Sequence, residues 1–137
     1  RRRRQPLSLL LVEIDDFADV AFEHGVERAR EKVRQLIGLV TSLPDKTTVQ
    51  ACSDSQIAVL IAGADRAAAV DTARHLLDSA RHGVGPAGDR HTLSIGVASV
   101  ALPAKNFPAD ALVDAAQRCL FGVRAGGGDG VKSIDIY

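Results

Sequence analysis

A run of four apolar residues, Leu-Leu-Leu-Val at positions 9–12, stands near the start of the chain. Alternate side chains of a strand point to opposite faces of a sheet, so this run is apolar on both faces. It therefore predicts a strand, within residues 6–15, at the centre of a sheet that is covered on both sides. This strand ends in three carboxylates, Glu13, Asp15 and Asp16.

The rest of the chain alternates between helical and strand-like patterns. We expect helices over 17–43 (divided at Gly25), 65–81 and from Pro108 to the glycine run 126–128, and strands over 47–52, 56–62, 91–100 and 131–137. The short polar link 53–55 predicts a hairpin tip. The order β-α-α-β-β-α-β-α-β predicts an α/β (α+β) fold with a ferredoxin-like, mixed five-stranded sheet.

The last predicted helix carries an apolar stripe that should face the sheet. Its members are Leu112, Val113, Ala116, Cys119, Leu120 and Val123.

Length and charge limit the classes of protein that fit. The 137 residues predict one domain, over residues 6–137, preceded by a basic linker or a cut end at residues 1–5. The 17 basic and 17 acidic residues give zero net charge, which argues against a nucleic-acid binder. Two cysteines, Cys52 and Cys119, form no disulfide framework, so we expect a reducing cytoplasm. No apolar run approaches the roughly 20 residues that span a bilayer.

The carboxylates at the end of the first strand are the strongest candidates for chemistry. Glu13 and Asp15 are two residues apart, so they should share one face of the strand, and paired carboxylates are typical ligands of Mg²⁺. The competing interpretation is that Asp15 or Asp16 caps the helix that begins near Phe17.

Two other motifs give weaker evidence for a functional site. The run Gly-Gly-Gly-Asp-Gly at 126–130 resembles a phosphate cradle, but it follows a helix, so a helix end and turn is the favoured interpretation. His75 and His82 are seven residues apart, which is too far for a metal pair on one helix, and solvated side chains are expected.

The ordered set LLVEIDDF, a long helical region, a hairpin ending IAVLI, and TLSIGVA resembles the GGDEF domain of bacterial diguanylate cyclases, from Pro6 to Ile136. The resemblance implies a nucleotidyl-cyclase-like fold. It also implies an ancestry in which two such domains, face to face, join two GTP molecules into cyclic di-GMP with the help of Mg²⁺.

The signature positions of that family differ in this chain. The GGDEF hairpin falls on Ser53-Asp54-Ser55-Gln56-Ile57, and all five residues are changed. Side chains at Ser53 and Asp54 would obstruct a nucleotide lying against the backbone. Ser55 lacks the metal-binding carboxylate, and Gln56 is neutral where the family has an acid. Glu13 falls on the other metal-ligand position and keeps its charge.

Of the further functional positions that the resemblance implies, one keeps the charge of the family residue and the others are changed. The two guanine-contacting residues fall on Ala21 and Arg30, and the inhibitory RxxD motif falls on residues 44–47, which read PDKT. The phosphate-contacting lysine falls on Arg124, which keeps a cation, and a later arginine falls on Gly128, which does not.

These changes favour a non-catalytic signalling domain that docks other signalling domains or proteins, with a homodimer left open and no cofactor required. A second hypothesis is a sensor of GTP or cyclic di-GMP, in which Mg²⁺ would accompany the nucleotide at Glu13 and Asp15, with Arg124 and the displaced Asp54 in support. A third is residual cyclase activity through Glu13 and Asp54. A fourth is an unrelated small-molecule-binding domain of ferredoxin-like fold.

Overall fold

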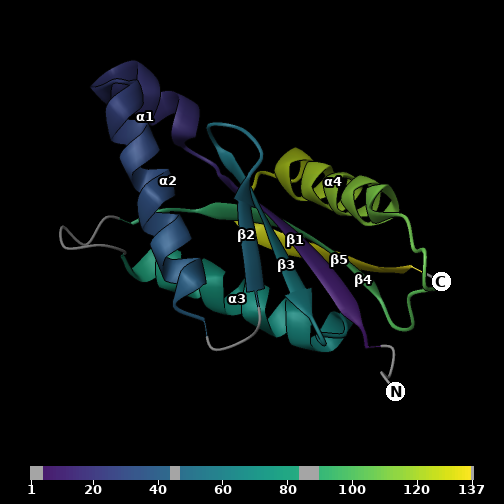
Figure 1. Cartoon of the computed structure of the whole chain (residues 1–137). Helices are drawn as coiled ribbons and strands as arrows, with labels where there is room; N and C mark the ends of the chain where they lie inside the picture. The colour runs from purple at the N-terminus through teal and green to yellow at the C-terminus, as the bar shows by residue number, and fades with distance from the viewer. Residues whose placement is uncertain (1–4, 44–46, 84–89, 137) are drawn as a thin grey trace.

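Figure 1 shows a computed structural model of the chain, which describes residues 5–43, 47–83 and 90–136. Within them the elements are β1 (Leu7–Ile14), α1 (Phe17–His24), α2 (Val26–Thr41), β2 (Thr47–Ala51), β3 (Gln56–Ala62), α3 (Arg66–His82), β4 (Leu93–Val100), α4 (Ala109–Ala125) and β5 (Gly130–Ile136). The predicted order of elements is confirmed. The Arg1–Arg4 run, residues 44–46 at the expected helix end, most of the expected loop 83–88 and Tyr137 lie outside the described residues.

The five strands form one mixed sheet in the order β2-β3-β1-β4-β5. β1 is antiparallel to both of its neighbours, β3 and β4, and β4 is parallel to the edge strand β5. The central place predicted for the apolar run in β1 is therefore confirmed. The five-stranded ferredoxin-like arrangement is confirmed with it.

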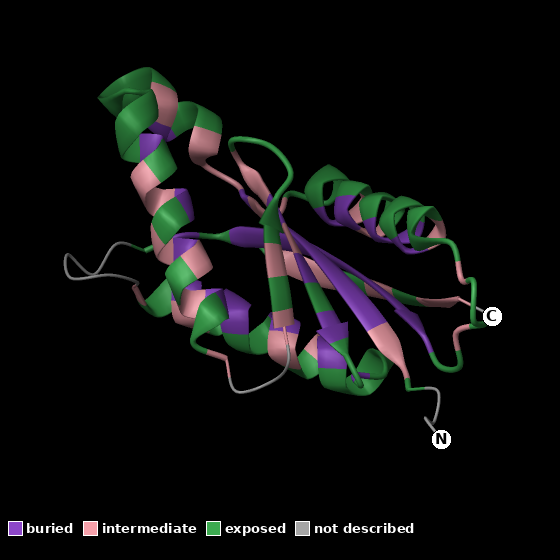
Figure 2. Cartoon of the chain, viewed as in Figure 1, coloured by how far each residue is buried: buried purple, intermediate pink, exposed green. Residues whose placement is uncertain are grey.

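Helices cover the two faces of the sheet unequally. Leu10, Val12 and Ile14 of β1 belong to a core packed by α2 and α3, whereas Leu9 and Leu11 belong to a second core packed by α4. Figure 2 shows the buried residues along β1 and β4 and on the sides of the helices that face them. Burying both faces of β1 is what its uninterrupted apolar run requires.

Gly96 brings α4 unusually close to β4. A Cβ atom at this position would lie 2.2 Å from the carbonyl oxygen of Ala116 and 2.5 Å from the backbone nitrogen of Leu120. Only glycine therefore permits this helix–strand contact. The contact fixes the height of α4 above the sheet and hence the place of the side chains on its last two turns.

Two details differ from the sequence-based expectation. Val113 was predicted to face the sheet, but it is 39% exposed, because its side of α4 borders an open apolar groove lined by residues of β1, β2 and β3. Cys119 of the same stripe is only partly buried. In β4 all eight residues are buried, although an alternating polar pattern was expected there. Its polar residues Ser94 and Ser99 make hydrogen bonds with β1 and the segment that follows it.

None of the helices described in the structure is long and apolar enough to cross a membrane.

Candidate functional site

The β2–β3 hairpin ends in the polar tip predicted from the sequence. The backbone N–H groups of Cys52 and Ser53 both donate to the carbonyl oxygen of Gln56, at 2.9 and 3.2 Å, and this closes the turn. The N–H of Ile14 donates to the carbonyl oxygen of Ser55 at 3.3 Å, which ties the tip to the end of β1. In Figure 1 the tip lies between the α1–α2 corner and α4.

Glu13 is at the centre of a polar network beside this tip. Strand pairing places it opposite Gln56 on β3. The side-chain amide of Gln56 donates to Glu13 Oε1 at 3.3 Å, and Arg124 Nη1 lies 3.1 Å from Glu13 Oε2. Gln117 in turn donates its side-chain amide to Gln56 Oε1 at 3.1 Å. The Glu13 side chain is only 12% exposed, so these partners compensate a carboxylate that has lost most of its water.

Asp15 belongs to a different set of contacts. Its Oδ1 accepts a hydrogen bond from the hydroxyl of Ser94, and its Oδ2 accepts one from the backbone N–H of Asp129 at 2.9 Å. Asp129 is held in turn by Arg81, whose Nε lies 2.8 Å from its carboxylate. This hydrogen bond raises the pKa of the Arg81 guanidinium above its usual value. Glu13 and Asp15 therefore have separate partners.

The last carboxylate of this group, Asp16, stands at the N-cap position of α1 but accepts no cap hydrogen bond. It pairs instead with Lys32 of α2, at 3.6 Å. The capping interpretation is thus right about the position of Asp16 and wrong about the role of its side chain.

Across the hairpin tip, Asp54 is paired with α2. Its carboxylate lies 3.7 Å from Nε of Arg30, and Arg30 also contacts Glu27 at 3.1 Å. Asp54 and Arg30 are both substantially exposed, so this ion pair adds little stability. It does set the charge at the tip, where the Arg30 cation faces the Asp54 anion.

Comparison with solved structures identifies the arrangement of strands and helices. The GGEEF domain of a diguanylate cyclase from Vibrio cholerae, described as active, superposes with a TM-score of 0.82 over 94% of this chain and 83% of that one, at 18% identity. This chain has the GGDEF fold. A scan against protein-family models and a search of curated proteins gave no match.

Two further GGDEF-fold structures were solved with bound partners. The GGDEF domain of DgcB from Caulobacter crescentus, in complex with cyclic di-GMP, has a TM-score of 0.77 at 13% identity and covers 93% of this chain and 77% of its own. The diguanylate cyclase SiaD from Pseudomonas aeruginosa, in complex with its activator SiaC, has a TM-score of 0.80 at 16% identity and covers 95% of this chain and 50% of its own.

The residues present do not fit the Mg²⁺ ion that the GGDEF resemblance implies. Both oxygens of Glu13 already have protein partners, as do both oxygens of Asp15, and Asp54 is turned toward Arg30. Ser55 contributes no carboxylate from the hairpin. Among residues 5–43, 47–83 and 90–136, no three His, Cys, Asp or Glu side chains gather in a way that could hold a metal ion.

The glycine run after α4 is a helix end and turn, as predicted. α4 ends at Ala125, and Gly127 and Gly128 adopt φ values of +108° and +79°. A Cβ atom at Gly128 would lie 2.9 Å from Asp15 Oδ2. The GGDEF resemblance puts a phosphate-contacting arginine at this position, and here neither the backbone conformation nor Asp15 leaves room for a side chain.

The two histidines of α3, His75 and His82, were expected to be solvated, and the structure places both at the surface. His75 is exposed, and the ring of His82 contacts the carbonyl oxygen of Asp78 in its own helix at 2.7 Å.

Sequence reasoning missed Gln117, Asp129 and Arg81, which complete the two networks. No local pattern marks them, since each meets its partner only through the tertiary fold.

Proposed function

We propose that this chain is a non-catalytic signalling domain, in which a GGDEF fold serves for docking other signalling domains or proteins and does not convert GTP to cyclic di-GMP. The observation that carries the proposal is the bonding of Glu13. The one carboxylate at a metal-ligand position of the resemblance is bound to Arg124 and Gln56. A metal would have to displace a guanidinium from a side chain that is largely shielded from water.

The hairpin supports the same conclusion. Phosphoryl transfer depends on electrostatic stabilisation of the transferred group, and metal ions supply much of it. Here Ser55 offers a hydroxyl where a second carboxylate is expected, and Ser53 and Asp54 add side chains where glycines would let a nucleotide approach the backbone. Arg30 stands where the resemblance implies a guanine-contacting aspartate, so the charge at that position is reversed.

The direct test is turnover. Purified protein is incubated with GTP and Mg²⁺ or Mn²⁺, and the products are separated by chromatography beside a GGDEF domain of proven activity. We expect no cyclic di-GMP above the level of a protein-free sample. Product that Glu13→Ala abolishes and Lys105→Ala leaves intact would refute the proposal and establish cyclase activity. Lys105 is a suitable control because it lines the apolar groove, whose lining includes none of the residues of the Glu13 network.

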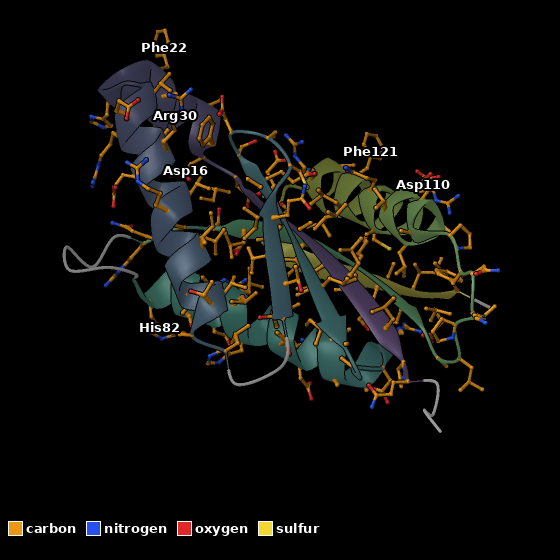
Figure 3. All side chains as sticks on the ribbon, viewed as in Figure 1. Asp16, Phe22, Arg30, His82, Asp110 and Phe121 are labelled. Atoms are coloured by element: carbon orange, nitrogen blue, oxygen red, sulfur yellow. The ribbon has the colours of Figure 1, made fainter. Side chains whose placement is uncertain are left out.

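Protein docking is the preferred role because the molecule presents apolar side chains that the fold does not use. Phe22 on α1 is 92% exposed and Phe121 on α4 is 74% exposed, and Figure 3 shows both pointing away from the ribbons. The SiaD structure is a case of a GGDEF-fold protein bound to a regulatory protein. We place this function in the cytoplasm, since Cys52 and Cys119 are free thiols that a reducing compartment would preserve.

Nucleotide sensing is the second candidate, and the exposure of Arg124 favours it. The Arg124 side chain is 56% exposed and pairs with Glu13 through Nη1, and a guanidinium has further N–H donors that can bind a phosphate. Calorimetric titration with GTP, GDP and cyclic di-GMP separates the two candidates. Binding heat that is lost in Arg124→Ala and kept in Arg118→Ala would establish a sensor, whereas no heat with any of the three leaves protein docking.

A further inference from the structure

The network around Glu13 joins three elements of the fold in a closed ring. Glu13 lies on β1, Gln56 on β3, and Gln117 and Arg124 on α4. Arg124 contacts Glu13, Glu13 accepts from Gln56, and Gln56 accepts from Gln117. Gln117 and Arg124 are seven residues apart, which is two helical turns, so both project from one side of α4. The ring therefore attaches α4 to the strands at two points.

The charges in this ring balance without an added ion. Glu13 carries one negative charge, Arg124 carries one positive charge, and the two glutamines are neutral. A carboxylate with 12% exposure would be costly without a counter-charge, and the ion pair at 3.1 Å supplies it. A glutamate in place of Gln56 would put a second negative charge opposite Glu13 and would create a demand for another cation.

We infer that Arg124 is the built-in cation of this site, and that its guanidinium together with the neutral Gln56 takes over the charge-balancing role of a divalent metal, so that β1, β3 and α4 hold their arrangement without one. The inference goes beyond the proposed function, because it concerns what holds the site together and not what the domain binds or converts. It assigns Arg124 and Gln56 as a matched pair.

Thermal unfolding of the intact chain, in EDTA and in millimolar MgCl₂ or MnCl₂, tests this assignment. Wild-type protein should show the same Tm in all three. Arg124→Ala should lower the Tm by about 5 °C, since one kcal/mol corresponds to roughly 2–8 °C in a domain of this size range. The matched control is Arg118→Ala, which removes an exposed arginine from the same helix and should leave the Tm unchanged.

Two double variants complete the test. In Glu13→Gln/Arg124→Ala the unpaired charge is gone, so the Tm should recover most of the loss seen in Arg124→Ala. In Gln56→Glu/Arg124→Ala two carboxylates face each other, and the Tm should rise on addition of Mn²⁺ while that of the wild type does not.

A wild-type Tm that rises with Mg²⁺ or Mn²⁺ would overturn the inference. A Tm of Arg124→Ala equal to that of Arg118→Ala would also overturn it. So would a Tm of Gln56→Glu/Arg124→Ala that does not change when Mn²⁺ is added. These outcomes are separate from the tests of the proposed function, which measure GTP turnover and nucleotide binding and not the effect of metal ions on the Tm.

Discussion

The carboxylate of Asp15 accepts a hydrogen bond from the backbone N–H of Asp129 at 2.9 Å, across 114 residues of sequence. This bond joins the end of the central strand β1 to the turn that leads from α4 into the edge strand β5. Arg81 at the end of α3 secures the other side of the turn through the Asp129 carboxylate. An acidic residue that suggests metal chemistry in the sequence is thus a structural link between three elements.

Substitution of Gly128 by alanine should destabilise the protein more than the same change at Gly127. Both residues have positive φ, and alanine there costs about 1–2 kcal/mol. At Gly128 the new Cβ would also lie 2.9–3.0 Å from the Asp15 carboxylate atoms, whereas at Gly127 it would meet no atom within 4 Å. Urea denaturation should therefore show a loss for Gly128→Ala that exceeds the loss for Gly127→Ala by at least about 1 kcal/mol. Equal losses would show that the contact between Asp15 and this turn is not formed in solution.

Alanine at Gly96 should be among the most damaging single-methyl additions in this fold. Its Cβ would collide with backbone atoms of Ala116 and Leu120, which cannot move without lifting α4 from the sheet. We expect a loss of about 3 kcal/mol or more in the free energy of unfolding, at the upper end for overpacking.

The matched control for Gly96 is Gly38, an exposed residue inside α2 where a Cβ would meet no atom within 4 Å. Gly38→Ala should stabilise the protein by about 0.5–1 kcal/mol, because alanine is the better helix former. Gly96→Ala protein as stable as wild type in the same denaturation series would contradict the close approach of α4 and β4.

The two thiols should react at different rates. Burial is the main cause that raises the pKa of Cys119, and the thiolate is the reactive form, whereas Cys52 is exposed at the end of β2. Alkylation with iodoacetamide near pH 8 should modify Cys52 first. The single-thiol variant Cys52→Ser, which keeps Cys119, should react more slowly than Cys119→Ser, and the reverse order would contradict the structure.

The raised pKa of Cys119 also makes the stability of the protein depend on pH. Because the folded-state pKa is higher than the unfolded one, the neutral thiol contributes stability below the unfolded pKa, and this contribution is lost as the pH rises through the folded pKa. The free energy of unfolding should thus decline slightly in the alkaline range. Cys119→Ser should remove that part of the decline.

The sequence was sufficient to predict the central position of β1, because a strand that is apolar on both faces must have both faces covered. It was insufficient for Val113, since helical spacing gives an apolar stripe but not the edge of the surface that the helix covers. On that side, α4 borders an apolar groove with a cavity volume of about 500 Å³. The stripe was therefore predicted wider than its buried part.

The site was predicted less completely than the fold. Strand periodicity put Glu13 and Asp15 on one face, and the resemblance drew attention to Gln56 and Arg124. Their partners could not be predicted, because Arg124 reaches Glu13 from a helix that lies more than a hundred residues later in the chain. Such long-range contacts decide whether two neighbouring carboxylates bind a metal ion together or each bond to protein groups of their own.

A crystal of this protein soaked with GTP and Mg²⁺ would test the central claim most directly. The account predicts that the ion pair between Arg124 and Glu13 persists, and that no metal lies between Glu13 and the hairpin residues 53–56. Two ordered metal ions bridging Glu13 and that hairpin, with the triphosphate beside them, would contradict it.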